Sequence, residues 1–225
     1  MEKQKKSARK SPYPYKLEDL KKIKGDSKFF YPYKLNLGCG RVYLNGWINS
    51  DLGDNNCMGE KIKIDKILDV NKYPYDLKDN SVDEVLCEDL IEKIEDLDKF
   101  LNELNRIMVV GGKAHIRVAY YAYWGIYAEV HTTPLHRFCI RCCNLFTIMK
   151  NNGFELVEKK AWNCNKYLNL FCPLINISDL TQGIYERFFA NIFPVSHVKW
   201  QIKKVRDCER KKEWVSYDSL KVKNS

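Results

Sequence analysis

The sequence lacks any long apolar run. No stretch of its 225 residues approaches the ~18–20 consecutive apolar residues that a membrane-spanning helix needs. The first ten residues, MEKQKKSARK, are charged and are not followed by an apolar segment, so they do not resemble a secretory signal. We therefore expect a cytoplasmic protein with no membrane partner.

The chain also lacks the cysteine pattern of a secreted disulfide framework. It has nine cysteines, an odd number, and one CxxC, which lies in HRFCIRCC. A closed zinc site needs four ligands, which here would be His136, Cys139, Cys142 and Cys143. The competing interpretation is a helix from Pro134 to about Asn151, started by Thr133, with one packed face made of Leu135, Cys139, Cys142, Phe146 and Met149. This second interpretation is favoured, and we expect no metal.

Excess charge is absent from the body of the chain. The net charge is +9, but residues 1–10 carry +4 and residues 199–225 carry +5, so residues 11–198 are neutral. A basic fold would indicate a nucleic-acid surface, whereas basic ends on a neutral body indicate it only weakly. We expect a basic disordered tail (1–12), a lead-in segment (13–33), one domain (34–206) and a basic C-terminal tail (207–225).

Strand patterns alternate with helical patterns along the domain. Helices are expected over 88–108, 134–151 and 184–192, and Gly111-Gly112 is expected to end the first. Strands are expected at 34–37, 47–52, 61–64, 66–70, 82–87, 113–119, 154–159 and 197–205. The clean alternation of the last one predicts an antiparallel strand. The order predicts an α/β fold with a doubly wound, mostly parallel sheet, which binds ligands at the carboxyl ends of its strands.

The first strand runs into a glycine-flanked turn in KLNLGCGRVYLNGWINSDLG. Glycines there let a ligand approach the backbone, because no Cβ is in the way. The dinucleotide fingerprint requires a third glycine three residues after Gly40, and Tyr43 occupies that position. The turn therefore favours a ligand without a pyrophosphate.

Two aspartates end the next two strands. Asp51 ends the second strand, where a carboxylate can accept both hydroxyls of a ribose. Asp69 ends the third, where it can accept from the exocyclic amino group of an adenine. Either residue alone is more typical of a turn, but their order on consecutive strands predicts a phosphate-free nucleoside site.

These motifs resemble the class I S-adenosylmethionine-dependent methyltransferase superfamily over about residues 34–160. LNLGCG is similar to the first motif of that superfamily, GWINSDL to the second and LDV to the adenine-side motif. VDEVLCEDLIEKI resembles the fourth strand and the helix after it, and LNELNRIMVVGGKAHIRV resembles the helix, Gly-Gly turn and fifth strand. The resemblance implies a Rossmann-like fold with a seven-stranded sheet, an antiparallel last strand and helices on both faces.

The resemblance also implies S-adenosylmethionine as cofactor and an in-line methyl transfer. The cofactor-binding residues it implies are Asn36, Gly38, Cys39, Gly40, Asp51, Leu52, Asp69, Val70 and Glu88. Four positions depart from the pattern: Asn36 replaces a frequent acid, Glu88 and Lys93 replace frequent histidines, and Val110 replaces a frequent proline. They leave the cofactor site intact but blur the subfamily.

The acceptor has to be sought in residues 120–136, just after the fifth strand. Tyr120, Tyr121, Tyr123, Trp124 and Tyr127 could form a stacking wall, and His131 is the best candidate base, ahead of His136. The Asn-Pro-Pro-Tyr and Pro-Cys motifs of DNA base methylation are absent. We expect a small-molecule or glycan acceptor; an RNA or protein acceptor bound through the basic tails, or a catalytically silent cofactor-binding partner protein, are the alternatives.

Overall fold

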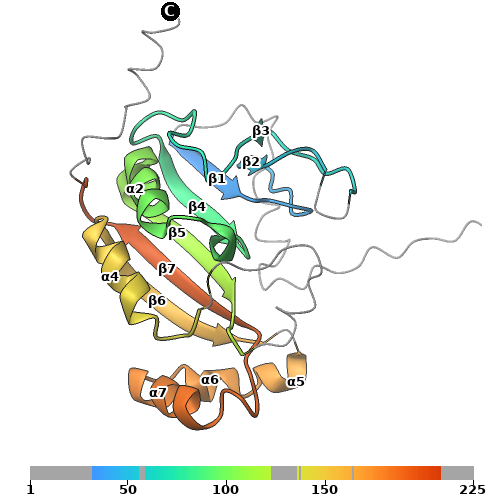
Figure 1. Ribbon diagram of the computed structural model, residues 1–225, viewed down its shortest axis with the longest axis vertical. Coiled ribbons are helices and arrows are strands. Elements are labelled where there is room, and N and C mark those ends of the chain that lie inside the picture. The colour runs from blue at the N-terminus through green and yellow to red at the C-terminus, as the bar shows by residue number, and fades with distance from the viewer. Residues whose placement is uncertain (1–31, 56–58, 123–135, 137, 164, 209–225) are drawn as a thin grey trace, which may run out of the picture.

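A seven-stranded sheet organises the chain in the computed structural model (Figure 1). The structure describes residues 32–55, 59–122, 136, 138–163 and 165–208. The strands are β1 (Tyr33–Leu37), β2 (Ile48–Asp51), β3 (Lys66–Ile67), β4 (Val82–Glu88), β5 (Met108–Ala119), β6 (Phe154–Trp162) and β7 (His197–Lys204).

The strand order is β3-β2-β1-β4-β5-β7-β6. Strands β1 to β5 are parallel, and β7 pairs antiparallel with both β5 and β6. This confirms the predicted Rossmann-like, mostly parallel seven-stranded sheet with an antiparallel last strand. The order reverses between β1 and β4, so ligands are expected at the carboxyl ends of these two strands.

Helices surround the sheet. They are the 3-10 turn η1 (Ile91–Lys93) and the helices α2 (Leu97–Ile107), α4 (Cys143–Asn151), α5 (Lys166–Asn169), α6 (Cys172–Ile175) and α7 (Asp179–Phe188). Helices α2 and α4 contact each other and the strands of one sheet face, whereas α5, α6 and α7 lie beyond the carboxyl end of β6 (Figure 1).

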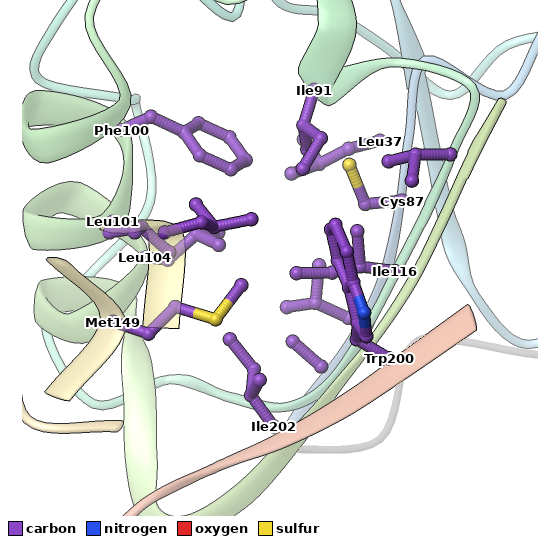
Figure 2. Packing of buried hydrophobic residues seen from close by; sticks show 14 of the residues in the cluster. Leu37, Cys87, Ile91, Phe100, Leu101, Leu104, Ile116, Met149, Trp200 and Ile202 are labelled. Atoms are coloured by element: carbon purple, nitrogen blue, oxygen red, sulfur yellow. The ribbon is translucent and has the colours of Figure 1, made fainter. Parts of the chain in front are cut away.

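The hydrophobic core lies between the sheet and the two helices α2 and α4 (Figure 2). Helix α2 begins at Asp96, whose carboxylate accepts from the Lys99 N–H at 3.0 Å. Its buried apolar residues recur at helical spacing and face alternate residues of the strands; Figure 2 shows Phe100, Leu101 and Leu104 opposite Leu37, Cys87, Ile116, Trp200 and Ile202. Each large side chain buried here contributes about 1.5–3 kcal/mol.

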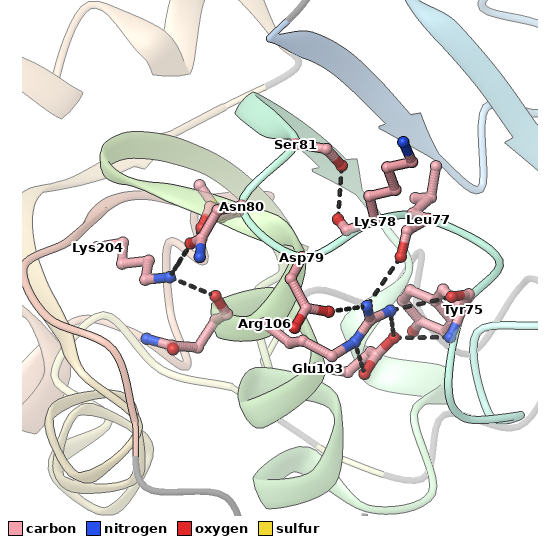
Figure 3. A network of polar contacts seen from close by, with 11 residues as sticks. Tyr75, Leu77, Lys78, Asp79, Asn80, Ser81, Glu103, Arg106 and Lys204 are labelled. Carbon is pink, nitrogen blue, oxygen red and sulfur yellow. Dashed lines mark hydrogen bonds and ion pairs between the residues drawn. The ribbon is translucent and has the colours of Figure 1, made fainter. Parts of the chain in front are cut away.

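Buried charges tie the amino end of the sheet to α2 (Figure 3). Arg106 donates to Glu103 at 2.5 Å, to Asp79 at 2.6 Å and to the carbonyls of Leu77 and Tyr75 at 2.8 and 2.9 Å. Its side chain and that of Glu103 are 5% and 2% exposed. The pair is stable because each polar atom has a partner inside the protein.

Lys204, the last residue of β7, forms a second buried polar centre at the same end (Figure 3). Its ammonium donates to the carbonyls of Asn105 and Met108 at 2.7 and 2.8 Å and to the side chain of Asn80 at 2.9 Å. It also pairs with Asp207 at 2.6 Å. Three hydrogen bonds and one ion pair thus hold this fully buried lysine. The sequence pattern predicted that Lys204 lies in a strand but did not predict its burial.

Several predicted boundaries are wrong in the first half of the domain. The strand expected at 61–64 is only an isolated bridge between Asn55 and Lys61. The single helix expected over 88–108 is a 3-10 turn followed by α2. Gly111-Gly112 does not end an element: β5 runs through it, with Gly111 at φ +92° and with Gly112 so close to the Asp83 carbonyl that a Cβ would lie 2.9 Å from it. The glycines let the strand bend rather than stop.

The second half also differs from the prediction. The helix expected from Pro134 begins at Cys143, and residues 138–142 before it form a loop. Thr133, Pro134 and Leu135 lie outside the described residues. Strand β6 extends to Trp162, and α5 and α6 occupy a region in which neither a helix nor a strand was expected. Helix α7 begins five residues earlier than expected, because Ser178 and Thr181 cap each other.

Candidate functional site: the carboxyl edge of the sheet

The glycine turn after β1 is closely packed on one side and open on the other. Gly38 and Gly40 have φ of +61° and +50°. A Cβ on Gly38 would lie 2.9 Å from a Leu90 methyl, whereas a Cβ on Gly40 would have no atom of residues 32–55, 59–122, 136, 138–163 and 165–208 within 4 Å. The turn is therefore held against the segment after β4 and leaves space beside Gly40.

Asp51 is fixed beside this space. Its Oδ2 accepts from the Gly40 N–H and its Oδ1 accepts from the Leu52 N–H, both at 2.8 Å. A carboxylate oxygen has two lone pairs, so each oxygen keeps one acceptor position. The predicted ribose acceptor is thus oriented before any ligand arrives.

The N–H groups of the turn are already engaged within the protein. Cys39 N–H donates to the Ser50 carbonyl at 2.9 Å, and Gly40 N–H donates to Asp51. Residues 41–47 form turns, so no helix N-terminus follows Gly40. This arrangement does not provide the donors that a pyrophosphate needs, in agreement with the expectation from Tyr43.

The Cys39 thiol is buried below the turn. Burial, with Asp51 as the next cause, raises its pKa to about 11, so the group is a thiol at neutral pH. Because the thiolate is the nucleophilic form, Cys39 contributes backbone to the site and no nucleophile.

Asn36 holds the turn from below. Its Nδ2 donates to the Val42 carbonyl at 2.8 Å and to Asn49 Oδ1 at 3.1 Å. Asn49, which the sequence analysis did not single out, is fully buried and its Nδ2 donates to Leu44, Trp47 and Asp65. The sequence does contain a sign of this role, because Asn49 is a polar residue at an inward-facing strand position in GWINSD.

Asp65 completes this support. It accepts from the Asn49 backbone at 2.9 Å and from the Tyr43 hydroxyl at 2.8 Å. Burial alone would raise the pKa of Asp65, but these hydrogen bonds and the charge of Lys63 hold it below its ordinary value. Tyr43, which stands where the dinucleotide fingerprint has its third glycine, thus anchors the loop between β1 and β2.

The residues after β2 and β3 lie at the same edge. Leu68 N–H donates to the Asp51 carbonyl at 2.9 Å, which brings Asp69 and Val70 next to Asp51 and Leu52. The Leu52 side chain is 68% exposed. Asp69 is 27% exposed at its side chain, pairs with Lys72 at 3.2 Å and accepts from the Asn71 N–H. An apolar surface and a carboxylate are therefore presented together.

A second set of charges lies at the ends of β4 and β5. Arg117 is 3.7 Å from Glu88 and also pairs with Asp89, whose φ is +51°. Burial raises the pKa of Glu88, and the charge of Arg117 opposes that shift. Asp89 and Arg117 were not predicted, because their partner comes from another strand.

His197, at the start of β7, extends this set. Its Nδ1 lies 2.9 Å from the Ser196 hydroxyl, its Nε2 lies 3.6 Å from Asp89, and its ring lies 5.4 Å from that of Trp162. Burial lowers the pKa of His197 to about 4, so the ring is neutral at neutral pH. The Ser196 hydroxyl engages Nδ1, and the neutral ring lies beside the Asp89 carboxylate.

Glu92 is the most unusual titratable group near the edge. Its Oε1 accepts from the Ala119 N–H at 2.8 Å, its Oε2 is buried without a hydrogen-bond partner among the described residues, and the residue is 4% exposed. Burial, followed by the charge of Asp89, raises the pKa of Glu92 to about 7. It was also missed, because the sequence shows only one more acid on a helical segment.

The acceptor loop is only partly described. His131, Tyr123, Trp124 and Tyr127 lie outside the described residues. Tyr120 is fully buried and its ring is 4.7 Å from that of Tyr121, so it belongs to the core and not to a wall that a ligand could touch. His136 places its Nε2 2.8 Å from the Ile94 carbonyl, which ties it to the segment after η1.

Cys139 and Cys142 of HRFCIRCC lie in the loop before α4, and Cys143 is the first residue of that helix. Cys139 and Cys142 sulfurs are 3.3 Å apart, and both residues pack against the core from outside a helix. The described residues contain no group of three or more His, Cys, Asp or Glu that could hold a metal. The apolar packing of these cysteines agrees with the favoured interpretation, although the predicted helical face does not form.

Comparison with known proteins also finds similarity to methyltransferases. Residues 56–116 match the family described as a methyltransferase domain. None of the curated proteins matches the sequence significantly. A chain from the complex between the Haloferax volcanii Trm112 methyltransferase activator and a methyltransferase is 17% identical, with a TM-score of 0.52, over 77% of this chain and 83% of that one.

Two further solved structures have a similar fold. A methyltransferase dependent on S-adenosylmethionine from Archaeoglobus fulgidus is 17% identical, with a TM-score of 0.50, over 76% of this chain and 86% of that one. Phosphoethanolamine N-methyltransferase 2 of Haemonchus contortus, with S-adenosylmethionine, is 16% identical, with a TM-score of 0.51, over 77% of this chain and 49% of that one.

Residues 56–116 therefore match a methyltransferase domain, and the sheet around them has the fold of solved S-adenosylmethionine-dependent methyltransferases. Both findings support the superfamily and the cofactor that the motifs predicted. The described residues include no helix that is long and apolar enough to cross a membrane.

Proposed function

We propose that the protein transfers a methyl group from S-adenosylmethionine to a small-molecule or glycan acceptor. The observation that carries the cofactor side is the Asp51 carboxylate, held by two backbone N–H groups beside the open side of Gly40. S-adenosylmethionine, when bound, supplies a methyl group activated by a sulfonium.

The residues present fit this cofactor. We propose that Asp51 accepts the ribose hydroxyls, that Leu52 and Val70 cover the adenine and that Asp69 accepts from its amino group. Gly38, Cys39 and Gly40 contribute a backbone surface without donors to a phosphate. Asn36 acts by holding that surface in place.

We propose that the acceptor binds over the ends of β4, β5 and β7. Asp89, Arg117 and His197 come together there beside Glu88, which the motifs assign to the cofactor, and the His197 ring lies next to that of Trp162. A few converging polar groups beside an aromatic ring suit a small polar acceptor. Protein groups that align the acceptor with the methyl group can supply about 7–11 kcal/mol at best.

His131 stays our candidate general base. His197 and His136 each direct a ring nitrogen at a protein group, which favours His131 by comparison. His131→Ala is expected to lower turnover and to leave cofactor affinity nearly unchanged, whereas equal turnover in the two proteins would remove this role.

Two alternative functions have specific support. The basic segments 1–10 and 199–225 favour an RNA or protein acceptor. The similarity to a chain from a complex that contains a methyltransferase activator favours a protein partner, and a catalytically silent partner protein is the limiting case. The similarity to a phosphoethanolamine methyltransferase favours the small-molecule class.

Calorimetry with S-adenosylhomocysteine and with NAD tests the cofactor site directly. Binding of the first and not of the second is expected, and the reverse would overturn the proposal. Methyl transfer from labelled cofactor is then compared across metabolite, glycan, RNA and protein pools. If RNA is the acceptor, deletion of residues 1–12 should weaken RNA binding and flatten its steep salt dependence.

A further inference from the structure

Residues 138–142, here called the cysteine turn, bring two thiols together outside the site described above. Ile140 and Arg141 form a turn, and Cys139 and Cys142 flank it. Their sulfurs lie 3.3 Å apart. A four-residue turn keeps its end Cα atoms within the ~7 Å that a disulfide can bridge, and the bond itself needs about 2.0 Å between sulfurs. A small movement of the two side chains is therefore enough to form the bond.

Two hydrogen bonds fix the backbone of the cysteine turn. The Phe138 carbonyl accepts from the Tyr121 N–H at 2.9 Å, and Glu186 Oε1 accepts from the Ile140 N–H at 2.6 Å. The Phe138 ring is buried and lies edge-on to the Trp200 ring, with centroids 5.6 Å apart. Because the fold keeps the two thiols beside each other, each meets the other at a high effective concentration.

The two thiols are not equivalent. The Cys139 N–H donates to the Cys142 sulfur at 2.9 Å, and the Cys142 thiol donates to the Cys139 carbonyl at 3.0 Å. The contact between the two sulfurs lowers the pKa of Cys139; the same contact, followed by burial, raises the pKa of Cys142. Since the thiolate is the nucleophile in exchange with a disulfide, Cys139 is suited to attack first and Cys142 to follow.

Three other described cysteines are protected from this chemistry. Cys39, Cys87 and Cys172 are 5%, 0% and 4% exposed, and burial raises the pKa of each thiol. Cys139 and Cys142 are only partly buried, so a small reagent can reach them. Exposure and a neighbouring thiol thus coincide at the cysteine turn.

We propose that Cys139 and Cys142 are a redox-active dithiol, which a small-molecule disulfide such as glutathione disulfide oxidises to an intramolecular disulfide. The Cys139 thiolate attacks one sulfur of glutathione disulfide, so that a mixed disulfide forms and one glutathione leaves. Cys142 then loses its proton and attacks the Cys139 sulfur, and the second glutathione leaves. The protein loses two hydrogens, and one glutathione disulfide is reduced to two glutathione thiols.

The dithiol lies beside the segment in which the acceptor is to be sought. Phe138 forms an isolated bridge with Tyr120, the residue that follows β5. A disulfide across the turn would constrain the backbone next to this bridge. Its relation to the acceptor rests on the proposed function, whereas the exchange chemistry does not.

Peptide mapping of the full chain in glutathione buffers tests the proposal. Trypsin cleaves after arginine and lysine, so the disulfide would join peptide 138–141 to peptide 142–150. After oxidation and alkylation of the remaining thiols, mass spectrometry should find this joined pair, and dithiothreitol should separate it. Cys143 lies in the second peptide, so the variant Cys143→Ser should still give the joined pair.

Two further variants separate the roles of the thiols. Cys142→Ser removes the second thiol, so the mixed disulfide between Cys139 and glutathione should accumulate about tenfold or more above the parent protein. The matched control is Cys208→Ser, which removes a partly buried cysteine near the end of the described chain and should behave like the parent. Circular dichroism verifies the fold of each variant.

Three results would overturn the proposal. One is that both thiols stay free at every ratio of oxidised to reduced glutathione. Another is that the mixed disulfide accumulates equally in the parent and in Cys142→Ser. The third is a joined pair that persists in Cys142→Ser, which would assign the bond to Cys143. None of these measurements depends on cofactor binding or turnover, so they are independent of the proposed function.

Discussion

Charged residues lie at both ends of the sheet, but the two ends differ in how completely the polar atoms of these residues are hydrogen-bonded within the protein. At the amino end, Arg106 and Lys204 are buried and surrounded by partners at 2.5–2.9 Å (Figure 3). At the carboxyl end, Asp51 and Asp69 keep acceptor positions, and Glu92 has a buried oxygen that no group in the described part of the chain bonds. Saturated polar groups stabilise a fold, whereas incompletely satisfied ones leave interactions for a ligand.

The largest effect is expected at the amino end. Arg106→Met removes the partner of Glu103, which is left as a buried charge. Breaking such a pair costs about 3–5 kcal/mol, so the free energy of unfolding should fall by that amount in urea titrations. Affinity for S-adenosylhomocysteine, measured where the variant is folded, should not change. A large change in affinity with little change in stability would invert the comparison.

At the carboxyl end, Glu92 should make stability depend on pH. Its pKa rises from an ordinary 4.5 to about 7 on folding, so the folded state holds a proton that the unfolded state has lost between these values. Stability from this group is therefore complete below about pH 4.5 and falls as pH rises through 7. Glu92→Gln should be more stable than the parent at pH 8, by about 3 kcal/mol at most, and similar at pH 4.5.

Two other groups provide the control for that experiment. The hydrogen bond from His115 and the charge of Lys34 lower the pKa of Glu84 to about 2, so its contribution is present above pH 4.5 and is lost in acid. Burial lowers the pKa of His197 to about 4, so its contribution rises with pH between 4 and 6.5 and opposes that of Glu92. Glu84→Gln should therefore lose stability at neutral pH, and parallel pH curves for all proteins would contradict the assignment.

A smaller effect, and one on binding, is expected at Asp51. Asp51→Asn keeps the size of the side chain but replaces one acceptor oxygen by a donor. Affinity for S-adenosylhomocysteine in calorimetry should fall about 10–100-fold, which is about 1.4–2.8 kcal/mol. Asp54→Asn, at an exposed carboxylate near the same edge, should bind like the parent. Equal affinities for the two variants would remove Asp51 from the site.

The smallest effect is expected at an exposed pair of the carboxyl edge. Lys72 pairs with Asp69 at 3.2 Å, but its side chain is 84% exposed. Exposed ion pairs contribute about 0–1 kcal/mol, so Lys72→Met should change the unfolding free energy by less than about 1 kcal/mol. If Lys72→Met lowered the free energy of unfolding as much as Arg106→Met does, burial would not explain the difference between the two ends of the sheet.

Much of the fold and the cofactor edge was readable in the linear pattern. Alternation predicted β7, because a strand with one buried face repeats every two residues. The order of Gly40, Asp51 and Asp69 predicted one edge, because carboxyl ends of parallel strands meet there. The acceptor residues were less accessible, since Asp89, Arg117 and His197 are brought together from β4, β5 and β7.

Two helices show where the sequence alone stops. Both α2 and α7 have apolar residues at helical spacing, yet Phe100 and Leu104 are buried and Leu180 and Phe188 are exposed. Periodicity determines which side chains share a face, but not whether another element lies against that face. The sequence by itself predicted which motif lies on which successive strand, and it predicted the cofactor class. Only the tertiary structure decided which charges are saturated, where Asn49 and Glu92 are buried and which apolar face stays open, because each depends on partners that are distant along the chain.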